Sequence, residues 1–292
     1  MHTRTVVASA TALVGAASLL LALSPARATG SDALPLVVAH RGASGYAPEN
    51  TLPAADKAAE LGVDWVENDV QRTRDGELVV LHDASLARTT NVEEVFPGRS
   101  PWKVKDFTAA EIARLDAGSW FGPAFAGTRV PTLEQFVRWL ERHDQKLSLE
   151  IKNPQLYPGI EGETLKVLAN EGWLDRAHLR DRLVVQSFSA DSVRTVHELK
   201  PGVKTGFIGA PPVKDLPVYA AFADQINPSY TSLSLSAGYV AAVQGFRGPH
   251  SKPLEVLTWT VDNAAAARRA AGFGVDGIIS NKPDVVRDAV GG

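Results

Sequence analysis

The feature that most constrains this 292-residue chain is a regular alternation of short apolar segments with amphipathic helical segments. Eight short segments have the composition of buried strands, and they cover residues 36–39, 65–70, 147–151, 183–187, 203–208, 225–227, 256–260 and 277–280. Helical patterns lie between most of them. Repeated strand–helix units predict an α/β fold, and this count predicts a closed (β/α)8 barrel, the TIM barrel.

The helical segments carry signals for their first residues. Residues 132–135 are Thr-Leu-Glu-Gln, which is a capping box at the start of an amphipathic stretch. A second helix is expected over 51–61, with Asn50 or Thr51 as its cap. We therefore interpret Glu49, Asn50 and Thr51 as residues that cap and orient this helix, although Asn50 could also reach a substrate.

One long segment interrupts the alternation. Residues 78–81 follow the second strand through Asp75-Gly76, which is a hairpin turn signal, so we expect them to pair antiparallel with that strand and to stay outside the parallel series. Residues 84–130 then contain several Pro and Gly pairs and little strand character. We interpret them as a small subdomain inserted after the hairpin, near the mouth of the barrel.

Residues 1–28 have the pattern of a signal peptide. Arg4 precedes an uncharged run from Val6 to Leu23, and Ala26-Arg27-Ala28 fits a cleavage site. The run approaches the length of a membrane anchor, but it is rich in small residues, so we favour export and expect no stable membrane span. The barrel domain is then 29–292, and the expected location is secreted or extracytoplasmic.

Composition excludes several kinds of site and partner. The chain has no cysteine, so disulfides, thiolate metal sites and cysteine nucleophiles are ruled out. A formal net charge of −3, without a long basic run, argues against nucleic acid as a partner. The sequence does not predict an oligomeric state.

Three acidic side chains are expected at the mouth of the barrel, where the C-terminal strand ends form the active-site face. Glu67 and Asp69 are two residues apart on one strand and therefore share a face, and Glu150 holds the matching position on the next barrel strand. Buried carboxylates repel one another unless a cation lies between them. Three oxygen ligands suit Ca²⁺ or Mg²⁺ rather than zinc. For a single carboxylate, the alternative is a salt bridge with Arg72 or Lys152.

Histidines and basic side chains are expected at the same mouth. His40 and Arg41 follow the first strand, His82 follows the hairpin strand, and Lys152 follows the third barrel strand. A histidine pair can act as general acid and base near neutral pH. Arg41 and Lys152 can hold phosphate oxygens, or they can pair with the carboxylates nearby. Asp83 is interpreted as a turn former.

Two aromatic side chains, Phe188 and Trp259, also stand at strand ends. They are ordinary as core residues, and as pocket walls they would pack the alcohol portion of a substrate. The histidines away from the predicted mouth are interpreted as structural, namely His143, His178, His197 and His250.

In their order and spacing, these motifs resemble the glycerophosphodiester phosphodiesterase family. The resemblance runs from about Val38 to Pro283 and rests on a series of short segments: His40-Arg41-Gly42, Pro48-Glu49-Asn50-Thr51, Glu67-Asn68-Asp69-Val70, Val79-Val80-Leu81-His82-Asp83, Leu149-Glu150-Ile151-Lys152, Gln186-Ser187-Phe188, Trp259-Thr260-Val261-Asp262 and Asp276-Gly277-Ile278-Ile279-Ser280. Asn68 stands where relatives often have an apolar residue, and we expect it to face away from the site.

The resemblance implies a metal-dependent enzyme that hydrolyses a small-molecule glycerophosphodiester to glycerol 3-phosphate and an alcohol. It implies Glu67, Asp69 and Glu150 as ligands of a divalent cation, Ca²⁺ or Mg²⁺. It also implies an acid–base pair and phosphate-binding residues, which are His40, His82, Arg41 and Lys152.

Other functions could use a similar mouth. A lysophospholipase D or a teichoic-acid phosphodiesterase would share the site and differ in the insertion and the apolar lining. A non-catalytic module that binds glycerophosphate or lipid headgroups need not keep both histidines with all three carboxylates. A glycosidase barrel also uses paired carboxylates, but it does not account for two histidines with Arg and Lys beside them.

Overall fold

The computed structural model describes residues 1–2 and 34–291. Apart from its first two residues, the predicted signal peptide over 1–28 lies outside the described residues. Within the described part of the chain, no helix has the length and apolar character needed to cross a membrane.

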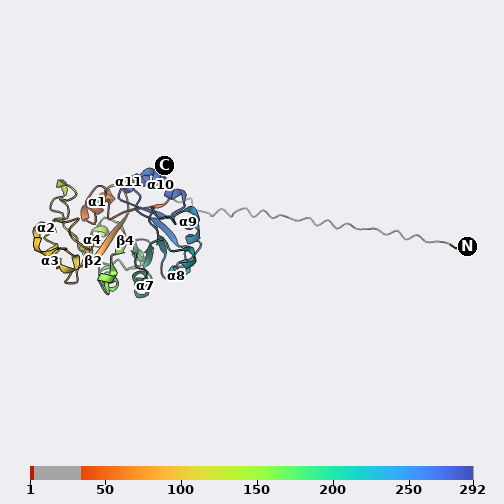
Figure 1. Ribbon diagram of the computed structural model, residues 1–292, viewed down its shortest axis with the longest axis horizontal. Coiled ribbons are helices and arrows are strands. Elements are labelled where there is room, and N and C mark those ends of the chain that lie inside the picture. Colours follow the sequence, from red (N-terminus) through yellow and green to blue (C-terminus); the bar gives the residue numbers. More distant parts are fainter. Residues whose placement is uncertain (3–33, 292) are drawn as a thin grey trace. The chain divides into compact units, whose positions relative to one another are not determined.

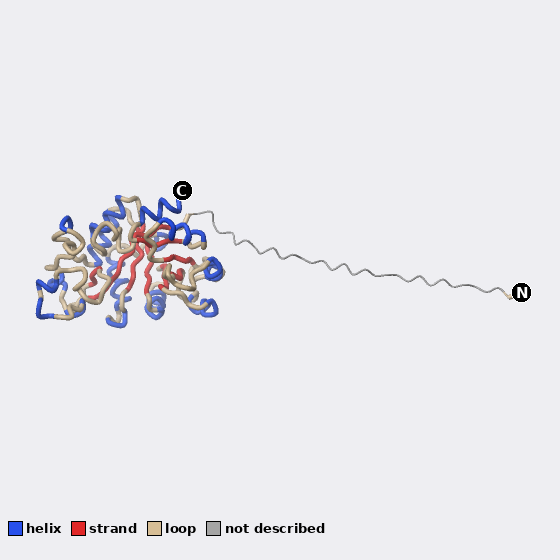
Figure 2. Tube along the Cα trace, turned by 45° about the horizontal axis from the view of Figure 1, so that its top comes forward, coloured by secondary structure: helices blue, strands red, loops and turns tan. Residues whose placement is uncertain are grey.

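The strands form the predicted barrel (Figures 1 and 2). Every consecutive pair around the barrel is parallel, and β1 pairs with both β2 and β9, which closes the cylinder. The barrel strands are β1 (Leu36–Ala39), β2 (Trp65–Arg72), β4 (Lys146–Ile151), β5 (Leu183–Ser187), β6 (Lys204–Ile208), β7 (Gln225–Asn227), β8 (Glu255–Thr258) and β9 (Gly277–Ser280). The expected hairpin is confirmed, because β3 (Leu78–Val80) pairs antiparallel with the end of β2.

Helices surround the strands, as Figure 2 shows in blue around red. Those of the barrel are α1 (Leu52–Glu60), α4 (Leu133–Arg142), α5 (Ile160–Asn170), α6 (Arg176–Asp181), α7 (Ala190–Leu199), α8 (Leu216–Tyr219), α9 (Ala237–Gln244), α10 (Ala264–Gly272) and α11 (Pro283–Gly291). Short 3-10 turns also follow two of the barrel strands, η4 (Pro154–Leu156) after β4 and η5 (Val213–Asp215) after β6.

Helix α4 shows how the sequence directs this arrangement. Thr132 accepts a hydrogen bond from the backbone of Gln135, whose side chain bonds back to Thr132, so the predicted capping box is present. One face of the helix is fully buried against the barrel, through Leu133, Phe136, Val137 and Leu140. Burial of each such side chain contributes about 1.5–3 kcal/mol.

Thr51 holds the N-cap position of α1, as predicted, but the expected capping hydrogen bond is absent. Its hydroxyl instead donates to the carbonyl of Pro48 at 2.6 Å. Asn50 does not cap the helix either, since its side chain bonds to Asp69. The motif around Asn50 therefore serves the interior of the barrel and not the helix end.

Residues 84–130 form a compact insertion beside the barrel, coloured yellow to yellow-green around α2 and α3 in Figure 1. Its elements are short: α2 (Val92–Val95), η1 (Pro97–Arg99), η2 (Val104–Asp106), α3 (Ala109–Ile112) and η3 (Pro123–Phe125). Its own apolar core includes Leu86, Val92, Phe107 and Leu115, all fully buried, and it packs on Val79 and Leu81 at the hairpin. The insertion is thus a small subdomain attached at β3.

Asn68 faces away from the barrel interior, as expected from its alternation with Glu67 and Asp69 on β2. It lies on the same face as Val66 and Val70, beneath the surrounding helices, and is fully buried. Neither polar atom of its side chain has a hydrogen-bond partner among the described residues. Asn68 is therefore a polar residue in an apolar layer, which costs stability.

Candidate active site

A cavity opens at the mouth of the barrel, and most of the predicted site residues line it. Its lining comes from the C-terminal ends of seven barrel strands and from the residue after the hairpin: His40, Arg41, Glu67, His82, Glu150, Lys152, Gln186, Phe188, Ile208, Trp259 and Ile279. Asp69 is the one predicted residue that does not line it, and it lies buried beside Glu67 and Glu150. No lining residue comes from 84–130, a stretch that the structure describes in full.

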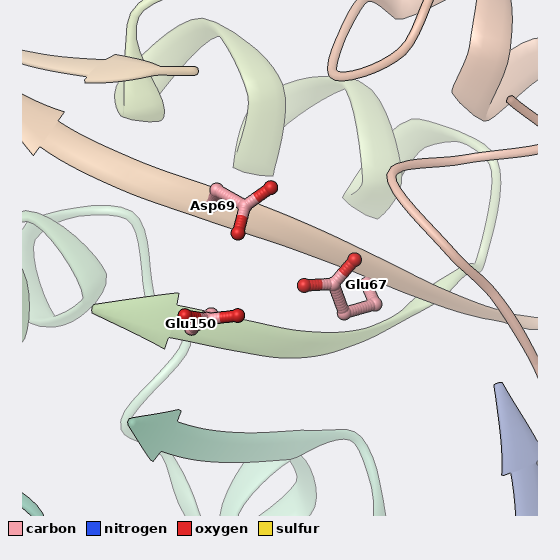
Figure 3. A group of neighbouring side chains, drawn as sticks. All are labelled: Glu67, Asp69 and Glu150. Atoms are coloured by element: carbon pink, nitrogen blue, oxygen red, sulfur yellow. The ribbon is translucent and has the colours of Figure 1, made fainter. Parts of the chain in front are cut away.

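The three predicted carboxylates meet beneath this cavity. The barrel register pairs Asp69 with Glu150 across β2 and β4, and Glu67 lies on the same face two residues earlier. One oxygen from each carboxylate lies within 4.8 Å of the others, and all three side chains are buried. Figure 3 shows them turned toward one another from the two neighbouring strands.

The charges of these carboxylates are only partly compensated. Burial and the neighbouring carboxylates raise the pKa of Glu67 well above its ordinary value. Burial and Asp69 raise the pKa of Glu150 to about 8. Although burial alone would raise the pKa of Asp69, the positive charges of Arg41 and Lys152 hold it below its ordinary value. The cluster holds more negative charge than its neighbours balance.

This arrangement fits a divalent metal ion. Oδ1 of Asp69 is buried and accepts no hydrogen bond from any described residue. Its other oxygen accepts a hydrogen bond from Asn50 at 2.8 Å, which fixes the carboxylate on the side away from the cluster. Three oxygen donors around one point are the ligand type that hard divalent cations take.

The turn after β1 brings backbone into the cluster. Arg41 and Gly42 both have left-handed backbone, with φ of 56° and 79°, and the Arg41 amide donates to Oε2 of Glu67 at 2.8 Å. A Cβ on Gly42 would lie 2.6 Å from the Cβ of Ala54, so no larger residue fits this turn.

Arg41 and Lys152 line the cavity beside the carboxylates. Nη1 of Arg41 donates to Glu49 at 2.9 Å, and its Nε lies 3.4 Å from Asp69. Nζ of Lys152 lies 2.6 Å from Glu150 and 3.8 Å from Asp69. The predicted alternative of ion pairing therefore holds for both residues. It does not hold for Arg72, which pairs with Glu163 on α5.

His40 is oriented by the half-buried side-chain amide of Asn281. Its Nδ1 lies 2.7 Å from Oδ1 of Asn281. Because Asn281 donates its own Nδ2 to Asp262 at 2.8 Å, its Oδ1 is the acceptor and Nδ1 of His40 is the donor. This leaves Nε2 of His40 as the basic nitrogen. Burial, followed by the charge of Arg41, lowers the pKa of His40 to about 4, so this imidazole is neutral near pH 7.

His82 is oriented by a carboxylate. Its Nδ1 lies 2.6 Å from Oδ1 of Asp83, and Arg88 donates two hydrogen bonds to the same carboxylate. The hydrogen bond from Arg88 lowers the pKa of Asp83 to about 2, so Asp83 accepts and Nδ1 of His82 donates. The interpretation of Asp83 as a mere turn former is wrong, because its side chain fixes the orientation of His82.

The far wall of the cavity is apolar. Phe188 and Trp259 form an edge-to-face pair with ring centroids 5.5 Å apart, beside Ile208 and Ile279. Phe188 remains 50% exposed, so one ring of the pair is open to solvent at the mouth. The cavity thus has a charged side with the histidines and an apolar side with the aromatic pair.

Several contributors were not predicted from the sequence: Gln186, Asn281 and Arg88. Gln186 is the penultimate residue of β5, and its only signal in the sequence is its place in the motif Gln186-Ser187-Phe188. Asn281 directly follows β9, a position that marks the active-site face of a barrel. Arg88 lies in the insertion, where no periodic pattern points toward the mouth.

The other histidines take structural roles where their contacts are clear. His178 is buried between Glu141 and Asp175, each at 2.9 Å, and His250 pairs with Asp224. His143 stacks on Trp139 on the outside of the barrel.

Comparison with protein-family models gives a match over most of the chain. The model described as the glycerophosphoryl diester phosphodiesterase family matches residues 40–285. A glycerophosphodiester phosphodiesterase of Bacillus subtilis (strain 168) is 36% identical over 261 residues, covering 86% of this chain and 84% of the relative. One from Caldanaerobacter subterraneus subsp. tengcongensis is 36% identical over 259 residues, covering 87% and 97%.

Solved structures agree in fold. A phosphodiesterase of Oleispira antarctica, determined in complex with the product sn-glycerol-3-phosphate, superposes with a TM-score of 0.74 at 26% identity, covering 89% of this chain and 98% of that one. A glycerophosphodiester phosphodiesterase from Agrobacterium tumefaciens gives a TM-score of 0.69 at 28% identity, covering 87% and 100%.

Proposed function

This chain belongs to the glycerophosphoryl diester phosphodiesterase family, and we propose that it hydrolyses glycerophosphodiesters with His40 as general base and His82 as general acid. The assignment rests on the different hydrogen-bond partners of the two imidazoles that line this cavity. His40 faces the neutral amide of Asn281, whereas His82 faces the carboxylate of Asp83. A neutral imidazole can accept a proton, and an imidazolium is stabilised by an adjoining carboxylate.

In the first step, Nε2 of His40 accepts the proton of the glycerol hydroxyl next to the phosphate. The hydroxyl oxygen forms a bond to phosphorus, and the bond from phosphorus to the alcohol oxygen breaks. Nε2 of His82 gives its proton to the departing alcohol. The products of this step are the free alcohol and a cyclic glycerol phosphate.

In the second step, water opens the cyclic phosphate with the histidine roles exchanged. His82, now neutral, accepts a proton from water, and His40 returns its proton to the glycerol oxygen that leaves phosphorus. Glycerol 3-phosphate is released, and both histidines regain their starting states.

The charged side of the cavity holds the phosphate. We expect Arg41 and Lys152 to bind its non-bridging oxygens, since both line the cavity beside the carboxylates. Glu67, Asp69 and Glu150 would hold a divalent cation, which supplies Lewis-acid charge stabilisation to the phosphoryl oxygens when bound. Their oxygen-only donor set favours Ca²⁺ or Mg²⁺.

The apolar side receives the alcohol portion. Phe188 and Trp259 offer ring surface to a small group such as choline or ethanolamine. A lysophospholipase D or a teichoic-acid phosphodiesterase would use the same charged side, and substrate comparison distinguishes these alternatives.

We also propose that the protein acts outside the cytoplasm. The support for this is the charge, apolar run and cleavage pattern of residues 1–28. Expression of the full chain with detection in the culture medium and cell fractions tests it, and full retention in the cytoplasm would contradict it.

The acid–base roles are tested by release of glycerol 3-phosphate from glycerophosphocholine, with Ca²⁺ or Mg²⁺ supplied. We expect His40→Ala and His82→Ala each to lower kcat by about 10²–10⁴-fold. His143→Ala, a histidine outside the barrel, should leave kcat unchanged. Full turnover by His82→Ala would reject its role as acid.

A further inference from the structure

We propose that Arg88 of the insertion is a positioning residue that holds His82 in place for proton transfer to the leaving alcohol. The inference rests on the acid–base roles proposed above, and it assigns the insertion a part in the reaction even though none of its residues lines the cavity.

The guanidinium of Arg88 joins two carboxylates at once. Its Nε and Nη2 donate to the two oxygens of Asp83 at 2.6 and 3.0 Å. Its Nη1 and Nη2 donate to the two oxygens of Glu49 at 2.8 Å each. Both edges of the planar fork are therefore used, which a lysine ammonium cannot reproduce.

This geometry fixes the plane of the Asp83 carboxylate. Asp83 is 30% exposed at its side chain, so without a partner it would be free to turn toward water. With both oxygens held by Arg88, Oδ1 stays 2.6 Å from Nδ1 of His82. The Nε2 of His82, which transfers the proton, then keeps a constant direction in the cavity.

The backbone of Arg88 is anchored in the insertion. Leu86 and Val92, on either side of it in sequence, are fully buried in the apolar core of the insertion. Thr90 closes the segment between them by donating to the carbonyl of Leu86 at 2.6 Å. The backbone of Arg88 is thus held by the insertion, and its 44% exposed side chain is held by its bonds to Asp83 and Glu49.

The second carboxylate extends the contact to the phosphate side of the cavity. Glu49 also accepts a hydrogen bond from Arg41 at 2.9 Å. The chain of contacts from His82 through Asp83, Arg88 and Glu49 to Arg41 joins the leaving-group side of the site to the phosphate side. A neutral side chain at position 88 would break this chain in the middle.

The test compares two substrates whose leaving groups differ in their need for a proton. Glycerophosphocholine releases an alkoxide that must be protonated, whereas glycerol 3-(4-nitrophenyl phosphate) releases a stable phenolate. We expect Arg88→Gln to lower kcat on glycerophosphocholine by about 10–100-fold and on the nitrophenyl ester by less than about 3-fold. Arg88→Lys should recover only part of the loss, and Asp83→Asn should show the same substrate preference.

Arg99→Gln is the matched control, because Arg99 is an ion-paired arginine inside the insertion that makes no contact with the site. It should change neither rate. Equal losses on both substrates by Arg88→Gln, or no loss on either, would overturn the proposal. If Arg88→Gln does not fold, Asp83→Asn and Arg88→Lys decide by the same ratio of rates. If His82→Ala loses no activity on glycerophosphocholine, the proposed role of His82 as acid is wrong. This variant therefore distinguishes a failure of the acid role from a failure of the Arg88 proposal alone.

Discussion

The two ends of the barrel differ in how fully their charged side chains are paired. At the N-terminal end, Nζ of Lys204 lies 2.7 Å from Glu255, and Gln225 donates to the other oxygen of that carboxylate at 2.8 Å. At the mouth, Glu67, Asp69 and Glu150 converge, and the buried Oδ1 of Asp69 accepts no hydrogen bond from a described residue.

This difference in pairing indicates that the two ends of the barrel have different roles. A matched pair such as Lys204 and Glu255 needs nothing further, and it fits the stabilising end of a barrel. A cluster with excess negative charge lowers stability unless a cation is bound. The carboxylates at the mouth therefore lower the stability of the fold and form a binding site, as functional residues often do.

The largest effect should come from removing a carboxylate at the mouth. Asp69→Asn keeps the shape of the side chain but removes a charge that the cation needs. We expect turnover of glycerophosphocholine to fall by about 10³-fold, since metal-ion stabilisation of the phosphoryl oxygens is worth several kcal/mol. Steady-state kinetics at saturating Ca²⁺ or Mg²⁺ measures this.

Glu255→Gln at the other end is the control for that comparison. It removes a carboxylate from a barrel strand without touching the mouth, and turnover should be unchanged. If both variants lost activity equally, the contrast between the two ends would be wrong.

The second effect concerns pH and stability in the metal-free protein. Glu67 and Glu150 have raised pKa values in the fold, Glu150 to about 8, so the folded state binds protons more tightly than the unfolded chain. Their contribution to stability is fully present below about pH 4.5 and is lost as pH rises toward 8. In EDTA we expect these two glutamates to lower the free energy of unfolding by roughly 2–5 kcal/mol over this range.

The free energy of unfolding should depend less on pH in Glu150→Gln, and also in the unaltered protein when Ca²⁺ is added. Denaturant titrations at several pH values measure it. Because Asp69 has a lowered pKa, its own contribution is lost only below its ordinary titration range, outside this window. The lowered pKa of His40 adds a trend of opposite sign, because its unfavourable contribution disappears as pH rises from about 4 to 6.5. The same pH dependence of stability in Glu150→Gln as in the unaltered protein would therefore contradict the charge excess.

The smallest predicted effect concerns Asn68, which lies on the outer face of β2, opposite to the carboxylates. Asn68 is as buried as its neighbours Glu67 and Asp69, but its side chain makes no hydrogen bond to a described residue and points away from the site. Asn68→Leu should raise the free energy of unfolding by about 1–2 kcal/mol and leave kcat unchanged. A loss of activity in this variant would mean that the outer layer of the barrel also serves the site.

Much of the fold was predictable because strand and helix signals are local. The strands β1, β5, β7 and β9 begin and end at the predicted residues, and the capping box of α4 forms as expected. Eight strands in regular alternation leave few topologies besides a barrel, so the predicted site residues at strand ends meet at one mouth.

What the sequence did not predict depends on contacts between distant segments. Asn281 reaches His40 across 241 residues, and Arg88 reaches Glu49 across 39. Asn50 and Asp83 were each assigned a local role, in a helix cap and a turn, because those roles are the ones that neighbours in sequence suggest. In the fold, Asn50 bonds to Asp69 and Asp83 bonds to His82, so each side chain holds a site residue.

The most direct test of the charge excess at the mouth is calorimetric titration of the EDTA-treated protein with Ca²⁺ and with Mg²⁺, in parallel with Glu67→Gln and Glu255→Gln. We expect saturable binding to the unaltered protein and to Glu255→Gln, and loss of that binding in Glu67→Gln. Equal binding to all three proteins, or no binding to any of them, would contradict it.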